Sequence, residues 1–153
     1  MKNFMKLELS AISENESFAR NAVAAFALSL NPSLSELSDI KTAVSEAVTN
    51  CVVHAYSNAK KSEERIVITC IAEEENERKV LHIDIEDFGC GMESVEKAMQ
   101  PFYTTLFFNE RSGMGFTIMQ TFMTEFSVRS ELGKGTLVSM MKIIDEEARE
   151  DDA

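Results

Sequence analysis

The first residues of the chain alternate between polar and apolar side chains. From Phe4 to Ser10, Leu7 and Leu9 fall on one side and charged residues fall on the other, a period that is typical of a half-buried strand. A helix is expected to follow, because Ser13 stands three residues before Glu16 and this spacing has the form of a capping box. Apolar residues then recur at helical spacing.

The longest expected helix runs from about Leu34 to Ala55, after the pair Asn31-Pro32 that ends the preceding helix. Its buried face consists of apolar residues at helical spacing: Leu37, Ile40, Val44, Ala47, Val48, Cys51 and Val52. This helix is expected to be packed against the rest of the core.

A β-hairpin is expected after the long helix. Residues 66–71 are β-branched and apolar, and residues 81–85 alternate between apolar and polar side chains. The polar stretch 73–79 is expected to be the turn between the two strands. A short helix is expected near residues 93–99.

The last part of the chain begins with an irregular segment. Residues 101–112 show no clean period, which is typical of a long and often functional loop. Helical spacing resumes over residues 115–123, and two strands at 125–130 and 136–144 complete the pattern.

These elements predict an α+β fold. Three main helices pack on one face of a mostly antiparallel sheet in a two-layer sandwich. We expect residues 1–153 to form a single domain, since 153 residues suit one well-packed core and are too few for two of ordinary size.

Charge and composition narrow the classes of partner. The chain has 15 lysines and arginines against 26 aspartates and glutamates, a formal net charge of −11, which opposes direct contact with nucleic acid or anionic lipid. The N-terminus has no long apolar core, and no apolar run approaches a membrane span. We therefore expect a cytoplasmic protein with no membrane contact.

The cysteines do not suggest a metal site or a disulfide framework. Cys51, Cys70 and Cys90 form no C-x-x-C pair, and their wide spacing fits neither arrangement. All three are expected to be small, buried and reduced.

A polar stripe accompanies the apolar face of the long helix. Glu46, Asn50 and His54 are four residues apart, so their side chains lie along one line of the helix. Taken alone, such a stripe is more often a half-exposed helix face than a binding site. His54 is at least as well explained as a structural hydrogen-bonding residue.

Three glycine-containing segments can carry chemistry. Asp87-Phe88-Gly89-Cys90-Gly91 follows a strand and sets a carboxylate beside a flexible turn. Arg111-Ser112-Gly113-Met114-Gly115 precedes a helix, whose free N–H groups can face an anion. Gly133-Lys134-Gly135-Thr136 has the form of a hairpin turn. Each segment alone is also common in ordinary turns and caps.

Together with the polar stripe, these segments resemble the N, G1 and G2 boxes and the terminal Gly-Thr of the GHKL ATPases. That superfamily includes gyrase-type ATPases, sensor histidine kinases and bacterial anti-sigma kinases. The resemblance implies a Bergerat-type fold that binds ATP or ADP with Mg²⁺. It implies that Asn50 holds Mg²⁺, that Asp87 binds the adenine amino group with help from Thr136, and that Glu46 orients or deprotonates a serine hydroxyl. A carboxamide oxygen suits Mg²⁺, and a carboxylate suits the hydroxyl proton in phosphoryl transfer.

The resemblance also implies a set of nucleotide contacts, including residues of a lid between the G boxes. These residues are Asn50, Asp87, Gly89, Gly91, Thr104, Thr105, Arg111, Ser112, Gly113, Gly115 and Thr136. The lid departs from related lids, which place a lysine and a proline after the paired threonines. Here Leu106, Phe107 and Phe108 follow, and these side chains are expected to pack inward or to meet a protein partner.

Three stretches are similar to the anti-sigma kinases of endospore-forming bacteria: SENESFAR, IKTAVSEAVTN and ERSGMGFTIMQTFM. The similarity covers nearly the whole chain. It implies a serine/threonine kinase that uses Mg-ATP to phosphorylate an anti-anti-sigma protein, and a homodimer that binds and inhibits a sporulation sigma factor. The homodimer would use the first strand and the neighbouring helix, and Arg20 would contact both partners.

Other functions stay open at this point. A stress-response anti-sigma kinase of the same superfamily would have the same boxes. A module that sequesters a sigma factor and uses ATP only as a structural ligand would also have them. The catalytic domain of a histidine kinase is disfavoured, because His54 and His82 are the only histidines and neither lies in a helical dimerisation segment.

Overall fold

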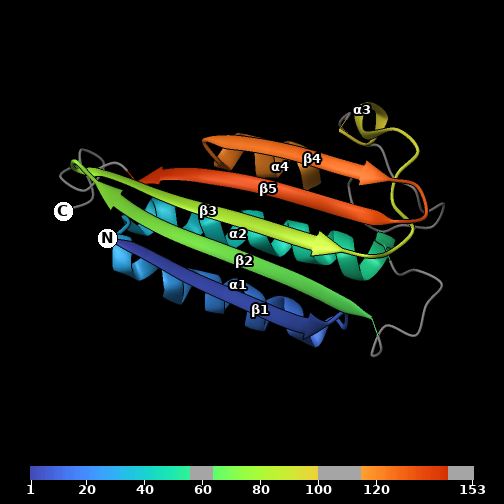
Figure 1. Cartoon of the computed structure of the whole chain (residues 1–153), viewed down its shortest axis with the longest axis horizontal. Coiled ribbons are helices and arrows are strands. Elements are labelled where there is room, and N and C mark those ends of the chain that lie inside the picture. The colour runs from blue at the N-terminus through green and yellow to red at the C-terminus, as the bar shows by residue number, and fades with distance from the viewer. Residues whose placement is uncertain (56–63, 100–114, 145–153) are drawn as a thin grey trace.

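The computed structural model of the chain describes residues 1–55, 64–99 and 115–144. Its centre is a five-stranded sheet in the order β1-β2-β3-β5-β4, in which every neighbouring pair is antiparallel (Figure 1). The strands are β1 (Lys2–Ser10), β2 (Arg65–Glu75), β3 (Arg78–Asp87), β4 (Glu125–Glu131) and β5 (Gly135–Ile144). The expected antiparallel sheet is confirmed.

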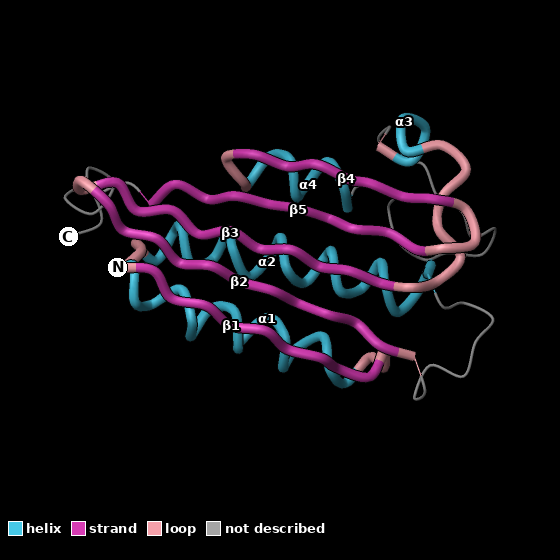
Figure 2. The backbone as a smooth tube through the Cα atoms, in the orientation of Figure 1, coloured by secondary structure: helices cyan, strands magenta, loops and turns pink. Residues whose placement is uncertain are grey.

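Three helices, α1, α2 and α4, cover one face of this sheet (Figure 2). The helical segments are α1 (Glu14–Ala27), η1 (Leu28–Leu30), α2 (Leu34–Asn50), η2 (Cys51–Ala55), α3 (Val95–Ala98) and α4 (Gly115–Phe122). α2 contacts both α1 and α4 and is therefore the middle helix of the layer. The two-layer α+β arrangement that the sequence predicts is confirmed.

The core fills the space between the sheet and the helix layer. Alternate residues of β2 and β3 face α2, as Ile68 and Ile83 show, and both are fully buried. Ile40, Val44 and Val48 meet them from the helix side and are also fully buried. Removing such a side chain to Ala typically costs about 2–5 kcal/mol in a packed core. The core thus fixes the position of the middle helix, α2, relative to the middle strand, β3.

The long helix changes its winding before it ends. α2 runs regularly to Asn50 and then continues as one π-helical segment, η2, from Cys51 to Ala55. A π turn widens the helix locally and shifts the angular position of the side chains that follow it. In an ideal α-helix His54 would lie almost directly in line with Asn50. The π turn between them changes this angular relationship, so the predicted line of side chains is interrupted after Asn50.

The capping box lies at a different helix from the expected one. Ser13 precedes α1 as predicted, but its side chain makes no capping hydrogen bond. Glu16 instead accepts hydrogen bonds from Arg20 and from Ser45 of α2. The full capping box is formed by Ser33 and Glu36 at the start of α2, with distances of 3.0 and 2.9 Å. Contacts to a second helix therefore override the local motif at α1.

The turn between β2 and β3 is shorter than predicted. The ladder continues through Glu75 and resumes at Arg78, which leaves only Asn76 and Glu77 in the turn. Both have positive φ angles, 53° and 66°, as a two-residue turn matched to the twist of a hairpin requires. The polar residues on either side belong to the strands.

Candidate functional site

The start of α4 touches the polar side of α2. A methyl group at Gly115 would lie 3.2 Å from Glu46 Oε2 and 3.4 Å from Asn50 Nδ2. Both side chains are half-buried. The glycine therefore lets the N-terminal end of α4 approach them closely, and free N–H groups at a helix start favour a negatively charged ligand.

Asp87 ends β3 and is buried, with 6% of its surface exposed. Its Oδ1 accepts hydrogen bonds from the backbone N–H of Gly89 at 3.1 Å and of Thr136 at 3.2 Å. Its Oδ2 accepts a hydrogen bond from the Cys51 thiol, with a donor–acceptor distance of 3.6 Å. Two segments remote in sequence, η2 and β5, thus join the turn after β3 at one carboxylate.

Burial and hydrogen bonding act in opposite directions on this carboxylate. Burial raises the pKa of Asp87, and the nearby charge of Glu86 adds to the rise, whereas hydrogen bonds from Gly89, Cys51 and Thr136 lower it. Burial prevails, so the pKa lies above the ordinary value of an aspartate. For the Cys51 thiol, burial and then the charge of Asp87 raise the pKa well above its ordinary value. The thiol is therefore the donor of the pair.

The turn after Asp87 packs against two other backbones. A methyl group at Gly89 would lie 2.2 Å from the carbonyl oxygen of Ala55, at the end of η2. At Gly91, where φ is +68°, it would lie 2.1 Å from the carbonyl oxygen of Glu131 at the end of β4. Only glycine fits such approaches. The Cys90 N–H also donates to Ala55 O at 3.0 Å, which ties the turn to the long helix.

Thr136 contributes to the same corner from β5. It lies opposite Asp87 in the ladder, and its hydroxyl forms a hydrogen bond of 2.8 Å with Ser130 Oγ. Ser130 Oγ also accepts the Met92 N–H at 2.8 Å. Neither the role of Ser130 nor the hydrogen bond from Cys51 to Asp87 was predicted from the sequence. The only sequence signal for Ser130 is the alternation along β4, which puts it on the same face of the strand as Phe126 and Val128.

The cysteines follow the prediction with one exception. All three are free, and Cys51 and Cys70 are buried. Burial raises the pKa of Cys70 to about 12. Cys90, predicted to be buried, is exposed, because the glycine turn that contains it lies beyond the end of the central strand β3, outside the core.

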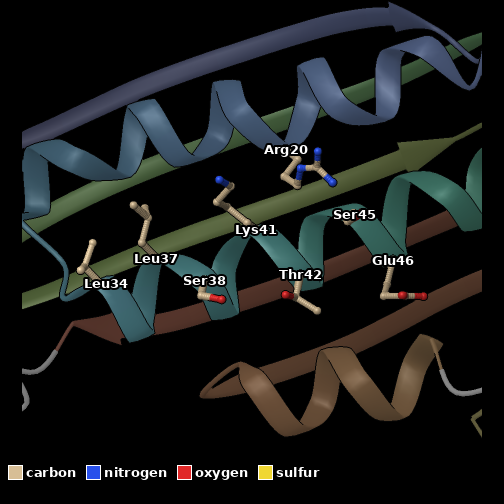
Figure 3. Close-up of a pocket in the computed structure, with 8 residues that line it drawn as sticks. All are labelled: Arg20, Leu34, Leu37, Ser38, Lys41, Thr42, Ser45 and Glu46. Atoms are coloured by element: carbon tan, nitrogen blue, oxygen red, sulfur yellow. The ribbon is translucent and has the colours of Figure 1, made fainter.

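Arg20 lies on α1 and lines a cavity shared with α2. Its guanidinium pairs with Glu16 at 3.2 Å, and its Nε is buried without a hydrogen-bond partner among the described residues. The cavity has a volume of about 470 Å³ (Figure 3). Its lining residues are Arg20, Leu34, Leu37, Ser38, Lys41, Thr42, Ser45 and Glu46. Glu46 therefore takes part both in this cavity and in the contact with Gly115.

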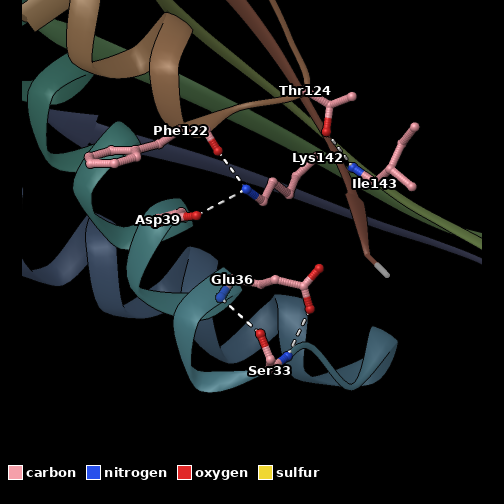
Figure 4. A network of polar contacts seen from close by, with 7 residues as sticks. All are labelled: Ser33, Glu36, Asp39, Phe122, Thr124, Lys142 and Ile143. Atoms are coloured by element: carbon pink, nitrogen blue, oxygen red, sulfur yellow. Dashed lines mark hydrogen bonds and ion pairs between the residues drawn. The ribbon is translucent and has the colours of Figure 1, made fainter. Parts of the chain in front are cut away.

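A partly buried ion pair holds the far end of α4. Lys142 of β5 donates to Asp39 Oδ2 of α2 at 3.1 Å and to the carbonyl oxygen of Phe122, the last residue of α4 (Figure 4). A cation at the C-terminal end of a helix also interacts favourably with the helix dipole. Both ends of α4 are thus fixed against α2, one by Lys142 and the other by packing of Gly115.

Five predicted contacts lie outside the described residues: Thr104, Thr105, Arg111, Ser112 and Gly113. The apolar lid residues 106–108 lie there too. In the described parts of the chain, no group of three or more His, Cys, Asp or Glu residues is arranged to hold a metal ion. Within the same parts, no helix has the length and apolar character needed to cross a bilayer.

Solved structures support the same fold. The chain superposes with a TM-score of 0.62 on the crystal structure of the RsbU and RsbW domains of a Mycobacterium tuberculosis protein, at 16% identity. That match covers 94% of this chain and 33% of the other. A mycobacterial sensor histidine kinase, MprB, gives a TM-score of 0.54 at 12% identity, over 93% of this chain and 98% of the other.

The chain belongs to the histidine kinase-like ATPase domain family, whose model matches residues 9–142. Within that family, its relatives include the anti-sigma F factors. The protein of that name from Caldanaerobacter subterraneus subsp. tengcongensis is 54% identical over 142 residues, which cover 93% of this chain and 94% of the relative. The anti-sigma F factor of Clostridium acetobutylicum is 49% identical over 142 residues, with the same coverage of both chains.

Proposed function

We propose that this protein is an ATP-dependent serine kinase that also binds a sigma factor. The observation that carries the proposal is the meeting of Glu46 and Asn50 with the start of α4, in a chain that belongs to the histidine kinase-like ATPase family. The similarity to proteins named anti-sigma F factor supports the sigma-factor part. We also propose that residues 1–153 act as one cytoplasmic domain.

The corner around Asp87 suits the base of the nucleotide. The carboxylate is buried and fixed by two backbone N–H groups, so the direction of its remaining lone pairs is set before a ligand arrives. It would accept a hydrogen bond from the adenine amino group. Thr136 would complete this part of the pocket, and Gly89 and Gly91 would keep the turn close to the base.

The side of α2 that faces α4 suits the triphosphate. Asn50 would hold Mg²⁺ through its carboxamide oxygen, since Mg²⁺ in nucleotide sites takes few protein ligands and keeps several waters. Gly115 leaves the space at the helix start unfilled by a side chain, which fits the close approach of a phosphate. We propose that Thr104, Thr105, Ser112 and Gly113 also contact the phosphates on this side. Arg111 would contact the γ-phosphate.

Glu46 is the proposed catalytic residue. The bound Mg-ATP supplies the phosphoryl group, which passes to a serine oxygen while ADP is released. Glu46 accepts the proton of the serine hydroxyl and orients its oxygen, a role that a half-buried carboxylate next to Asn50 can perform. Positioning and neutralisation of charge account for most of the catalysis in such reactions.

The cavity beside Arg20 suits a protein partner. Arg20 and Lys41 line it together with the apolar side chains of Leu34 and Leu37, and Leu34 is 82% exposed. We propose that Arg20 contacts both a sporulation sigma factor and an anti-anti-sigma protein, the serine-containing substrate. The protein would act as a homodimer, joined through β1 and the neighbouring helix.

The proposal is tested by incubating the protein with labelled ATP, Mg²⁺ and a purified anti-anti-sigma protein. Glu46→Gln should bind ATP normally but slow the transfer by about 10²–10⁴-fold, the usual contribution of a general base. Asn50→Ala should abolish transfer by weakening the binding of Mg-ATP. The matched control is Glu125→Gln, which changes an exposed glutamate on β4 and should have no effect.

Three results contradict parts of the proposal. Transfer at the normal rate in Glu46→Gln removes the catalytic assignment of Glu46. Sigma-factor binding by the wild-type protein without any transfer indicates a sequestering module that uses ATP as a structural ligand. Label on a histidine of the protein itself contradicts serine specificity.

A further inference from the structure

The two oxygens of Asp87 have different surroundings. Oδ1 accepts two backbone hydrogen bonds, from Gly89 and Thr136, and each carboxylate oxygen has two lone-pair sites. Oδ1 is therefore fully used. Oδ2 accepts one hydrogen bond, from the Cys51 thiol, and has one lone-pair site left. A ligand that hydrogen-bonds to Asp87 must use the oxygen that Cys51 also contacts.

We propose that Cys51 is a positioning residue that makes Asp87 selective for an amino purine over an oxo purine. The inference rests on the proposed function, in which Asp87 contacts the base. The thiol stands at the first residue of η2, directly after Asn50, and reaches a carboxylate 36 positions away in the sequence. It occupies one lone-pair site of Oδ2 and thereby fixes the direction in which the other site points.

The selectivity follows from the charge state of the carboxylate. An ionised carboxylate only accepts hydrogen bonds, so it attracts the amino group of adenine and repels the oxo group of guanine. A protonated carboxyl can donate to the oxo group and loses this discrimination. A thiol that donates to Oδ2 stabilises the ionised form. Without that donor, the carboxyl group gains protons at a higher pH.

Among the residues that the structure describes, few other groups act on Asp87 electrostatically. Glu86 precedes it in β3 and its charge opposes ionisation. Its ladder neighbours are Ile66 on β2 and Thr136 on β5, neither of which titrates. In the described part of the helix layer, the titratable group that acts on Asp87 is Cys51. The thiol is thus the side chain by which the helix layer controls this carboxylate.

Cys70 provides a matched control. It is fully buried, as Cys51 nearly is, but it lies on β2 between Met5 and Ile83 in the sheet register, away from Asp87. Cys70→Ala removes the same atoms from the core as Cys51→Ala. A general loss of packing therefore affects both variants, whereas a change in base selectivity is expected only at Cys51.

The experiment measures the dissociation constants of Mg-ATP and Mg-GTP at several pH values between 5 and 8. For Cys51→Ala, the preference for ATP over GTP should fall about tenfold at neutral pH, the size expected for one hydrogen bond to a charged group. The pH at which the preference disappears should also move upward. Cys51→Ser restores a donor and should recover the preference. Cys70→Ala should keep the wild-type ratio.

Cys51→Val retains bulk without a donor, and it replaces the alanine variant if circular dichroism shows that variant to be unfolded. An unchanged ratio of ATP to GTP affinity in a folded Cys51 variant without a donor overturns the inference, as does failure of Cys51→Ser to recover the ratio. Asp87→Asn distinguishes a failure of the proposed function from a failure of the role assigned to Cys51. If Asp87→Asn binds ATP with wild-type affinity, the proposed function itself is contradicted. If Asp87→Asn loses ATP binding while Cys51→Ala keeps the wild-type ratio of ATP to GTP affinity, only the role of Cys51 is contradicted.

Discussion

Gly115 lies against Glu46, so closely that a methyl group at the glycine would stand 3.2 Å from the carboxylate oxygen. The contact joins the first residue of α4 to the middle helix, and a methyl group would fit between them only if the carboxylate moved by a few tenths of an ångström. The same glycine faces Asn50, so one position controls the distance between the helix start and both polar side chains.

Gly115→Ala should therefore weaken ATP binding by about tenfold, because the new methyl group pushes the Glu46 carboxylate aside and fills the space at the helix start. Isothermal titration with ATP and Mg²⁺ measures the effect. The control is Gln120→Ala, which changes an exposed side chain of the same helix and should leave the affinity unchanged. Equal affinity in Gly115→Ala and the wild type would show that α4 does not contact the nucleotide.

Asp87→Asn should lose most ATP binding, about a hundredfold, yet unfold no more readily than the wild type at neutral pH. The folded-state pKa of Asp87 is raised above its unfolded value, mainly by burial, so ionisation of this group opposes folding. The protonated carboxyl favours the folded state. The stability that it contributes is fully present below the unfolded pKa and is lost as the pH rises through the folded pKa. Asparagine avoids that loss.

Urea unfolding of Asp87→Asn and the wild type at pH 7 and at pH 4 tests the direction in which pH changes their difference in the free energy of unfolding. The variant should gain stability relative to the wild type at the higher pH, and the difference should change in favour of the wild type as the pH falls. A difference that changes the other way indicates that the hydrogen bonds from Gly89, Cys51 and Thr136 outweigh burial.

Lys142→Met should destabilise the protein by about 1–3 kcal/mol, because it leaves Asp39 without its partner and the last turn of α4 without its cation. The pair lies between β5, α2 and α4, where the lysine side chain is only 13% exposed. The double variant Lys142→Met/Asp39→Asn should recover part of the loss. Additive losses in a double-mutant cycle measured by urea unfolding indicate that the ion pair contributes nothing beyond packing.

Ser33→Ala and Ser13→Ala form a matched pair at two helix starts. Ser33 accepts the Glu36 N–H and belongs to a full capping box, so its removal should cost about 1 kcal/mol. Ser13 makes no capping hydrogen bond, and its removal should change the free energy of unfolding by less than about 0.5 kcal/mol. Equal losses would contradict the difference between the two starts.

These two serines also illustrate how far local sequence predicts local structure. Both are followed three residues later by glutamate, and sequence patterns alone chose the wrong capping box. Glu16 is drawn away from Ser13 by Ser45 and Arg20, and Ser45 lies 29 residues further along the chain. Helix positions were predictable from apolar spacing, whereas the partner of a polar side chain depended on the packing of two helices.

The same distinction applies to the sheet and the candidate site. The strands were predictable where apolar residues alternate, but β2 and β3 extend through Glu75 and Arg78, whose polar side chains carry no such signal. In the site, the glycine segments were visible as motifs. The hydrogen bond from Cys51 to Asp87 was not, because it joins two segments that only the folded helix layer and sheet bring together.

Glu46 borders the cavity of Arg20 on one side and contacts Gly115 on the other. Under the proposed function, a small molecule that fills the cavity would reach the Glu46 carboxylate without entering the corner around Asp87 that is proposed for the base. Its inhibition would be noncompetitive with ATP, and selection for resistance would favour substitutions at Lys41 or Thr42 over those at Glu46, because only the latter also disables the enzyme. A drug aimed at this face would thus avoid competition with the high concentration of ATP in a cell.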